Sequence, residues 1–463
     1  MALQEALRFP NVPVRVLNSL HWDVLRLFDD IKHGLAHIAR EHRAEVASIG
    51  LDTWGVDFAL MGRDDELLGN PFHYRDARTD GVMPQAFRHV PREQIFAQTG
   101  VQFMPINSLY QLFAMKLQNA LALEQATKFL MMPDLFNFWL TGQKVCEFTD
   151  ATTTQFYDPR ARAWAHPLFE ALSLPFHILP EIVSPGTVLG PLHKSVADEV
   201  GLQVPVIAPA CHDTGSAVAA VPAEGGDYAW ISSGTWSVLG ADVSEPVINA
   251  ASLAYNFTNE GGVGGTFRLC KNVMGLWIVQ ACRHTWAGSG AELSYDTLTE
   301  MARRAPAFRS LIDPDDDAFL HPGDMPARIA DYCRRTVQPI PEDKGAFVRC
   351  ALEGLALKYR FQLERLEILL GKKVDTLHII GGGSQNKLLC QLTADATGKR
   401  VIAGPAEATA LGNVLLQALR LGHFASLEEG RQVIRRSFAT TVYEPCDGAA
   451  WDDAYARFRN LLK

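Results

Sequence analysis

In the first half of the chain, segments in which apolar residues recur with the period of a helix alternate with segments that have the pattern of a strand. Helical spacing over 23–43 leads into the apolar run 46–61, which the polar bend 52–55 divides into two predicted strands. The other elements predicted in this half are helices at 107–122 and 126–140, the latter interrupted at Pro133, a strand at 204–208, a polar bend at 211–215 and a small-residue helix from Ser216.

The second half repeats the alternation of strands and helices. A β-hairpin is predicted at 228–240 with its turn at 232–235, and a long helix at 344–370 that Gly371 ends. The other elements predicted there are strands at 376–380 and 401–402, a glycine-rich turn at 381–386, and helices at 387–397 and 407–421. Such alternation in both halves predicts a two-domain α/β protein. The linker VPAEGG (221–226) divides it into domains 1–221 and 222–463.

Composition narrows the class of protein. The 463 residues are 48% hydrophobic and 21% charged, which is typical of a soluble globular protein. A net charge of −9 disfavours a nucleic-acid binder, and no apolar run is long enough to span a membrane. The N-terminus has no export-signal pattern, and the eight cysteines form no CxxC pair. We therefore expect a cytoplasmic protein with reduced thiols, no nucleic-acid partner and no membrane association.

Two segments could carry phosphate or proton chemistry. The glycine-rich turn at 381–386 follows a predicted strand, and its backbone N–H groups could approach an anion; a tight structural turn explains it equally well. It matches neither GxGxxG nor the P-loop pattern. Asp213, between His212 and Thr214 at the end of a strand, could accept a proton from a hydroxyl. Taken alone, a helix-capping role for Asp213 is the stronger interpretation.

Three further segments have an ordinary structural interpretation beside a functional one. The 232–235 turn offers hydroxyl and N–H groups for phosphate oxygens, although turn chemistry explains it as well. Trp54 in the 52–55 bend suits a sugar face, but packing is the favoured interpretation. The acidic run 313–317 is not a calcium loop, because Ala318 stands where glycine is needed, and is expected to be a solvated loop.

Together these segments are more specific than any one of them. The chain resembles the FGGY family of carbohydrate kinases, and within it the L-rhamnulose kinases, from about Leu7 to the C-terminal region. The motifs that carry the resemblance are LDTWGVDFALM, YRDART, TDATTTQ, CHDTGSA, ISSGTWS, KNVMGLW, IIGGGSQN and GPAEATALGN.

The resemblance implies a fold, a reaction and a set of site residues. The fold is an actin-like, ribonuclease H-like pair of domains around a central cleft, with a sugar-binding domain at 1–221 and a nucleotide-binding domain at 222–463. The reaction is ATP-dependent phosphorylation of L-rhamnulose at its 1-hydroxyl, with Mg²⁺, in L-rhamnose degradation. By this match Asp213 is the catalytic base. The other implied site residues are Gly55, His212, Thr214 and Asn272 for the sugar and Thr235, Gln280 and Gly382 for ATP.

The start of the chain departs from the family pattern. Family members open with a β-hairpin that carries a DxGxxxxR-type phosphate loop, whereas Leu7–Pro10 resembles the part just after it. We therefore expect the first domain to lack that hairpin. A non-catalytic sugar-binding protein and a kinase for another ketose are the alternatives that follow. Cys333 and Cys350 lie where some members pair cysteines, and reduced thiols are expected here.

Overall fold

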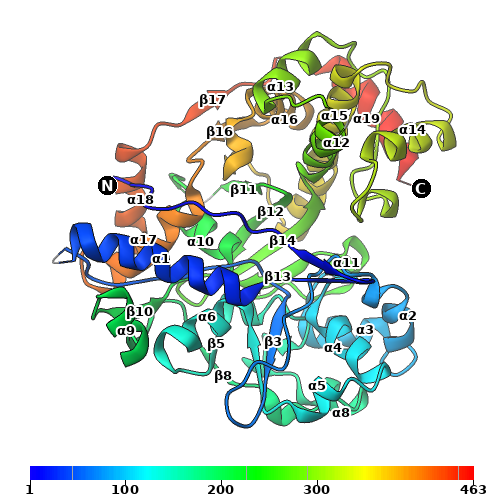
Figure 1. The fold of residues 1–463 in the computed structure, drawn as a ribbon. Coiled ribbons are helices and arrows are strands. Elements are labelled where there is room, and N and C mark those ends of the chain that lie inside the picture. Colours follow the sequence, from blue (N-terminus) through cyan, green and yellow to red (C-terminus); the bar gives the residue numbers. More distant parts are fainter. Residues whose placement is uncertain (44, 226, 289, 447, 463) are drawn as a thin grey trace. The chain divides into compact units, whose positions relative to one another are not determined.

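The structure, a computed structural model, describes residues 1–43, 45–225, 227–288, 290–446 and 448–462, which form two compact units (Figure 1). The first unit consists of Met1–Ala220, Asp242–Leu269 and Thr409–Ile434, and the second of Val221–Ala241, Cys270–Ala408 and Arg435–Lys463. The chain first changes unit at the start of the predicted linker, whose Gly226 lies outside the described residues. Two later segments belong to the first unit again, which no pattern in the sequence indicated.

Short strands and mostly short helices make up the first unit. Its elements are β1 (Val14–Val16), β2 (Ser19–His21), α1 (Val24–His42), β3 (Phe58–Met61), η1 (Ala77–Thr79), α2 (Val82–Ala86), α3 (Arg92–Thr99), α4 (Ser108–Leu117), α5 (Leu121–Gln125), β4 (Lys128–Met131), α6 (Met132–Thr141), β5 (Val145–Glu147), α7 (Phe148–Ala151), β6 (Tyr157–Asp158), β7 (Ala163–Trp164), α8 (His166–Ala171), η2 (Phe176–Ile178), β8 (Glu181–Val183), β9 (Thr187–Pro191), α9 (Lys194–Val200), β10 (Pro205–Ala208), α10 (Asp213–Ala219), α11 (Ala250–Tyr255) and β13 (Thr258–Gly261).

The second unit is built on a sheet. Its elements are β11 (Tyr228–Ser233), α12 (Trp277–Gly288), α13 (Tyr295–Arg304), η3 (Asp317–Phe319), α14 (Met325–Arg335), α15 (Lys344–Leu370), β15 (Thr376–Ile380), η4 (Gly382–Gln385), α16 (Lys387–Thr397), β16 (Arg400–Ala403), β17 (Thr441–Tyr443) and α19 (Ala449–Leu461). Four elements cross from one unit to the other along their length: β12 (Trp236–Val243), β14 (Phe267–Met274), α17 (Ala408–Arg420) and α18 (Leu427–Ser437).

Parallel pairing in the first unit brings two polar bends to one edge. The segment from Ile49 to Thr53 runs parallel to the chain around β10, with bridges from Ile49 to Val206 and from Thr53 to His212. The polar residues that follow these two apolar segments therefore emerge at the same end. This pairing positions the 52–55 bend beside the start of α10.

The sheet of the second unit places two loops in the same way. Within this unit, β11 pairs parallel with β15, and β15 pairs parallel with β16. The hairpin turn after β11 and the glycine loop after β15 therefore leave the same edge of the sheet. The long helix α15 packs against α13 and α16 (Figure 1).

Most of the predicted elements are confirmed, some of them to the residue. Helix α15 spans 344–370 and ends at Gly371, which has a left-handed φ of 66°. The helix predicted at 126–140 is confirmed from 132 onward as α6 and wrong before it, because 128–131 form β4. Pro133 does not interrupt the helix but lies in its first turn. Proline is accommodated there, since the first N–H groups of a helix have no intrahelical partner. Helix α4 ends at Leu117, five residues earlier than predicted, and Asn119 beyond it has a φ of 50°.

The predicted bend at 211–215 is shorter than expected. Helix α10 begins at Asp213, so that only Cys211 and His212 belong to the bend. Among the described residues, no helix combines the length and apolar character needed to cross a membrane.

Candidate active site

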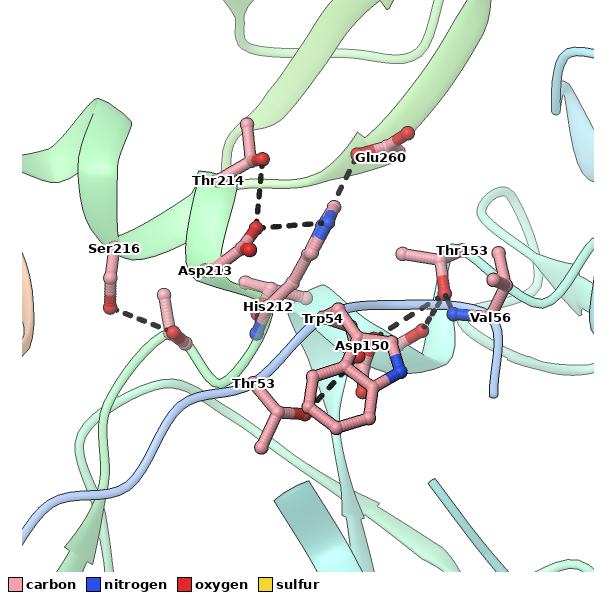
Figure 2. Close-up of polar contacts among 12 residues, drawn as sticks. Thr53, Trp54, Val56, Asp150, Thr153, His212, Asp213, Thr214, Ser216 and Glu260 are labelled. Carbon is pink, nitrogen blue, oxygen red and sulfur yellow. Dashed lines mark hydrogen bonds and ion pairs between the residues drawn. The ribbon is translucent and has the colours of Figure 1, made fainter. Parts of the chain in front are cut away.

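Asp213 lies in the first turn of α10, directly after the bend that leaves β10 (Figure 2). Its backbone N–H donates to the carbonyl of Thr53 at 2.8 Å. Its Oδ1 accepts a hydrogen bond from Thr214 Oγ1 at 3.0 Å and lies 3.6 Å from His212 Nε2. Its Oδ2 makes no hydrogen bond among the described residues, and the side chain is 45% exposed. The carboxylate is thus held at one oxygen and open at the other, an arrangement suited to a general base.

The structure contradicts the interpretation of Asp213 as a helix cap. His212 is the N-cap residue of α10, and no side chain makes a capping hydrogen bond there. Asp213 is instead the first residue inside the helix. Its side chain is therefore available for contacts other than capping.

The TDATTTQ motif holds the backbone around this site. Helix α7 and the turn after it present threonine hydroxyls that accept hydrogen bonds from three separate backbone N–H groups. The pairs are Thr149 Oγ1 with His212 N (3.1 Å), Thr153 Oγ1 with Val56 N (3.0 Å) and Thr152 Oγ1 with Gly261 N (2.7 Å). Figure 2 shows the Thr153–Val56 contact to the right of Asp213. A short motif thus ties the two bends and the end of β13 together.

The bend at Gly55 is conformationally demanding. A Cβ atom at Gly55 would lie 2.9 Å from Thr153 Cγ2, so only glycine fits without a shift. The next residue, Val56, has a φ of 64°, which is rare for a β-branched residue. Its carbonyl accepts from Ser108 Oγ at 2.5 Å. Strain of this kind persists where surrounding bonds enforce it, and it concentrates at functional sites.

Asp57 is a site residue that the motif analysis missed. Its Oδ2 accepts from the indole N–H groups of Trp22 (2.6 Å) and Trp54 (3.1 Å), and its Oδ1 accepts from Gln111 Nε2 (2.9 Å). The rings of Trp22 and Trp54 lie 4.2 Å apart. Burial raises the pKa of Asp57 to about 6. Packing of Trp54, the favoured interpretation, is confirmed, and the signal was the second aspartate of DTWGVD.

Buried carboxyl groups surround the Cys211–His212 bend. Glu147 Oε2 accepts from the backbone N–H of Cys211 at 2.9 Å, and burial raises the pKa of Glu147 to about 7. Burial raises the pKa of Asp150 well above its ordinary value, and nearby negative charges, Asp213 among them, add to the shift. Asp52 accepts from Asn413 Nδ2 at 2.5 Å, and burial raises its pKa to about 7. The GPAEATALGN motif, which contains Asn413, therefore supports the 52–55 bend.

The residues expected to contact ATP are adjacent in the second unit. Thr235 Oγ1 donates to Gln280 Oε1 at 3.1 Å, and the backbone N–H of Trp277 donates to the carbonyl of Thr235 at 3.1 Å. The glycine loop lies against the same hairpin, since a Cβ atom at Gly383 would lie 2.0 Å from Ser233 Oγ. A Cβ atom at Gly382 would meet nothing within 4 Å. Gly382 thus leaves an open backbone position beside the hydroxyl-bearing turn, which suits an anionic ligand.

The glycine loop differs in one respect from expectation. It continues into the single 3₁₀ turn η4 before α16 begins, and the Asn386 side chain caps α16 by accepting from Leu389 N at 3.0 Å. The N-terminus of α16 is therefore already partnered, and the backbone of the loop itself is the feature available to a phosphate.

Asn272 lies half-buried on β14 in the second unit, two residues before Met274. The backbone N–H of Met274 donates to Asp315 Oδ1 at 2.8 Å, and Lys358 Nζ lies 2.8 Å from Asp313 Oδ1 and 3.0 Å from Asp315 Oδ2. The expectation of a solvated loop at 313–317 is wrong for these two aspartates, because Lys358 anchors them. No group of three or more potential metal ligands occurs among the residues described.

Comparisons with known proteins agree with these motifs. Residues 15–220 match the N-terminal domain of the FGGY family of carbohydrate kinases, and residues 229–421 match its C-terminal domain. The chain is 46% identical, over 463 residues, to a protein named rhamnulokinase from Bacteroides thetaiotaomicron, covering all of this chain and 94% of that protein. It is 41% identical to a rhamnulokinase from Halalkalibacterium halodurans, covering 96% of this chain and 94% of that protein.

Solved structures show the same fold at lower identity. A xylulose kinase from Lactobacillus acidophilus has a TM-score of 0.76 at 19% identity, covering 98% of this chain and 90% of the other. A glycerol kinase from Plasmodium falciparum, solved with ADP, has a TM-score of 0.77 at 15% identity, covering 98% and 92%. The two-domain α/β sugar-kinase fold is therefore confirmed. With two domain models matched in order and relatives aligned along the whole chain, this protein belongs to the FGGY family of carbohydrate kinases.

Proposed function

We propose that this carbohydrate kinase transfers the γ-phosphoryl group of ATP to the 1-hydroxyl of L-rhamnulose, forming L-rhamnulose 1-phosphate and ADP in L-rhamnose degradation. The relatives named rhamnulokinase support the choice of sugar. The observation that carries the mechanism is the carboxylate of Asp213, held at Oδ1 and open at Oδ2. Phosphoryl transfer needs mainly positioning and charge stabilisation, together with a group that receives the hydroxyl proton.

In this mechanism Asp213 is the base, and its neighbours orient the sugar. Oδ2 accepts the proton of the 1-hydroxyl as the oxygen attacks phosphorus, while Thr214 and His212 keep Oδ1 in place. Gly55 and Asn272 are the further proposed sugar contacts. The geometry at Gly55 supports its proposed role, because a side chain at this position would displace Thr153.

The nucleotide is assigned to the second unit. Thr235, Gln280 and Gly382 are the proposed ATP contacts, because the first two are hydrogen-bonded to each other and the third presents an open backbone. We propose that Mg²⁺ binds together with ATP. Such an ion is normally coordinated by the substrate phosphates and by only one or two protein carboxylates, and it would neutralise phosphate charge. A sugar-binding role for 1–221, a nucleotide-binding role for 222–463, the central cleft and the cytoplasmic location stay predictions.

The test is ADP release with Mg-ATP and L-rhamnulose. Asp213→Asn should fold normally and lose about 10²- to 10⁴-fold in kcat, because the amide cannot accept the proton. Asp375→Asn, an exposed change in the second unit, serves as the matched control and should retain full turnover. Activity of Asp213→Asn close to the parent would remove Asp213 from the role of base.

The choice of sugar has its own test. Initial rates with L-rhamnulose, L-fuculose and L-xylulose at equal concentrations should rank L-rhamnulose first in kcat/KM. A higher kcat/KM for either of the other ketoses would replace the proposed substrate while leaving the kinase reaction intact.

A further inference from the structure

A buried ion pair lies behind His212, on the side away from Asp213. Glu260, the third residue of β13, and Arg268, on β14, belong to the first unit, and their side chains are 5% and 1% exposed. Arg268 Nη2 lies 3.3 Å from Glu260 Oε2, and Arg268 Nε donates to the carbonyl of Gly261 at 2.7 Å. Two buried charges are thus kept together and fixed to the backbone.

Both charged groups face the same imidazole nitrogen. His212 Nδ1 lies 3.1 Å from Arg268 Nη2 and 3.4 Å from Glu260 Oε2 (Figure 2 shows the glutamate contact). A guanidinium can only donate hydrogen bonds, so the shorter contact requires Nδ1 to present its lone pair. The neutral imidazole then carries its proton on Nε2, which faces Asp213 Oδ1 at 3.6 Å.

We propose that Arg268, with Glu260 as its counter-charge, is a positioning residue that holds His212 in the Nε2–H form, so that this N–H points at the carboxylate of Asp213. This N–H keeps Oδ1 occupied, which leaves Oδ2 for the hydroxyl proton. Glu260 has a separate part, because it balances the arginine charge that burial would otherwise make costly. This inference rests on the proposed role of Asp213 as the base.

The contacts predict what removal of each partner does to the imidazole. In Arg268→Met, Glu260 is the charged group that remains at Nδ1 among the described residues, and it is a hydrogen-bond acceptor. The proton therefore moves to Nδ1, and the lone pair of Nε2 faces Asp213. In Glu260→Gln the arginine still donates to Nδ1, so the proton stays on Nε2. Arg268→Lys keeps a donor and should retain the Nε2–H form.

The experiment is ¹⁵N NMR of the full chain labelled at histidine, with the His212 signals assigned by comparison with His212→Gln. The parent is expected to show a protonated Nε2 and an unprotonated Nδ1, and Arg268→Met the reverse. Arg268→Met should also lose about 10- to 100-fold in kcat, as orienting residues typically do, with a smaller change in KM. Arg349→Met is the matched control: it breaks the buried Arg349–Glu353 pair (2.5 Å) in the second unit and should leave the His212 signals unchanged.

A protonated Nδ1 in the parent overturns the inference, whether or not any variant folds. So does an Nδ1–H form in Glu260→Gln, or a folded Arg268→Met that keeps Nε2–H. Failure of the proposed function can be told apart from failure of this inference. Full activity of Asp213→Asn would rule out Asp213 as the base, whereas the expected His212 signals would still support the assignment of the imidazole proton to Nε2.

Discussion

At the scale of single residues, the 52–55 bend beside Asp213 is shaped by side chains that form hydrogen bonds with backbone groups. The hydroxyl of Thr153 accepts from Val56 N, and the same side chain fills the space beside Gly55. The positive φ of Val56 is kept by this bond and by the one from Ser108. The bend therefore depends on the absence of a Cβ atom at one position and on a hydroxyl at another.

Gly55→Ala should disturb this bend. The added methyl would approach Thr153 Cγ2 to 2.9 Å, and overpacking of this kind costs about 1–3 kcal/mol. We expect a lower free energy of unfolding in urea and a lower kcat/KM for the sugar. Gly288→Ala, where the added atom meets nothing within 4 Å, is the control. Adding Thr153→Ser should restore part of the loss, and an unchanged kcat/KM in Gly55→Ala would show that the bend tolerates the methyl group.

A buried carboxyl predicts how stability depends on pH. Asp134 is 1% exposed, and burial raises its pKa to about 8 from an ordinary value of 3.8. Between these values the folded state binds a proton that the unfolded state releases, so stability falls as pH rises from about 4 to 8. Asp134→Asn removes this dependence. The free energy of unfolding of the variant minus that of the parent should therefore be larger at pH 8 than at pH 4, by on the order of a few kcal/mol.

Urea unfolding at a series of pH values measures this difference. Asp64→Asn, an exposed change in the same unit, is the control and should follow the parent. Parallel curves for the parent and Asp134→Asn would contradict the raised pKa of Asp134.

At the scale of elements, close approach of backbone decides where glycine is required in helices. Gly354 in α15 packs so closely on the loop between α13 and η3 that a Cβ atom would lie 2.5 Å from the carbonyl oxygen of Ile312. Gly34 in α1 is different, since its Cβ atom would lie at an ordinary 3.6 Å from Leu7. Both glycines lie within predicted helices, at 23–43 and 344–370, and only packing distinguishes them.

The same substitution should therefore act in opposite directions at the two positions. Gly34→Ala should stabilise the protein by about 1 kcal/mol through helix propensity. Gly354→Ala has the same propensity gain, but the clash with a backbone atom outweighs it, so a net loss is expected. Thermal unfolding of both variants measures the difference, and a Tm for Gly354→Ala at or above that of the parent would contradict the close approach.

At the scale of the whole molecule, the two units are assembled from segments far apart in the sequence. Residues 409–434 belong to the first unit, where Asn413 donates to Asp52 across a sequence separation of 361 residues. The division of the proposed roles between a sugar unit and a nucleotide unit can be tested by ligand-induced stabilisation, which requires a ligand to bind the folded state.

Gly382→Val should separate the two ligands. ADP at 100 times its Kd is expected to stabilise the parent by about 2.7 kcal/mol. A Cβ atom at this position meets nothing within 4 Å, so we expect the fold to accept valine, whose side chain would occupy the open backbone position. The Tm increase with ADP should be lost while that with L-rhamnulose is kept, and Gly288→Val should retain both. A full ADP shift in Gly382→Val would place the nucleotide elsewhere.

The local elements and their motifs were determined by the sequence itself. Helix α15, strand β15 and the turns at 52–55 and 381–386 follow from periodicity and from glycine, because these signals act between near neighbours in the chain. The family resemblance indicated the candidate base, Asp213, and its partners, whereas the residues taken alone favoured a helix cap.

Only the tertiary structure decided what surrounds those residues. The contacts of Asp57 with Trp22 and Gln111, the anchoring of Asp313 by Lys358, and the contact of Arg268 with His212 join residues that lie far apart in the chain. No local pattern encodes such pairs, since burial makes each charge require a partner without specifying which segment supplies it. Pairing of strands and packing of helices make that choice, and they thereby determine how the side chains beside the proposed base are held.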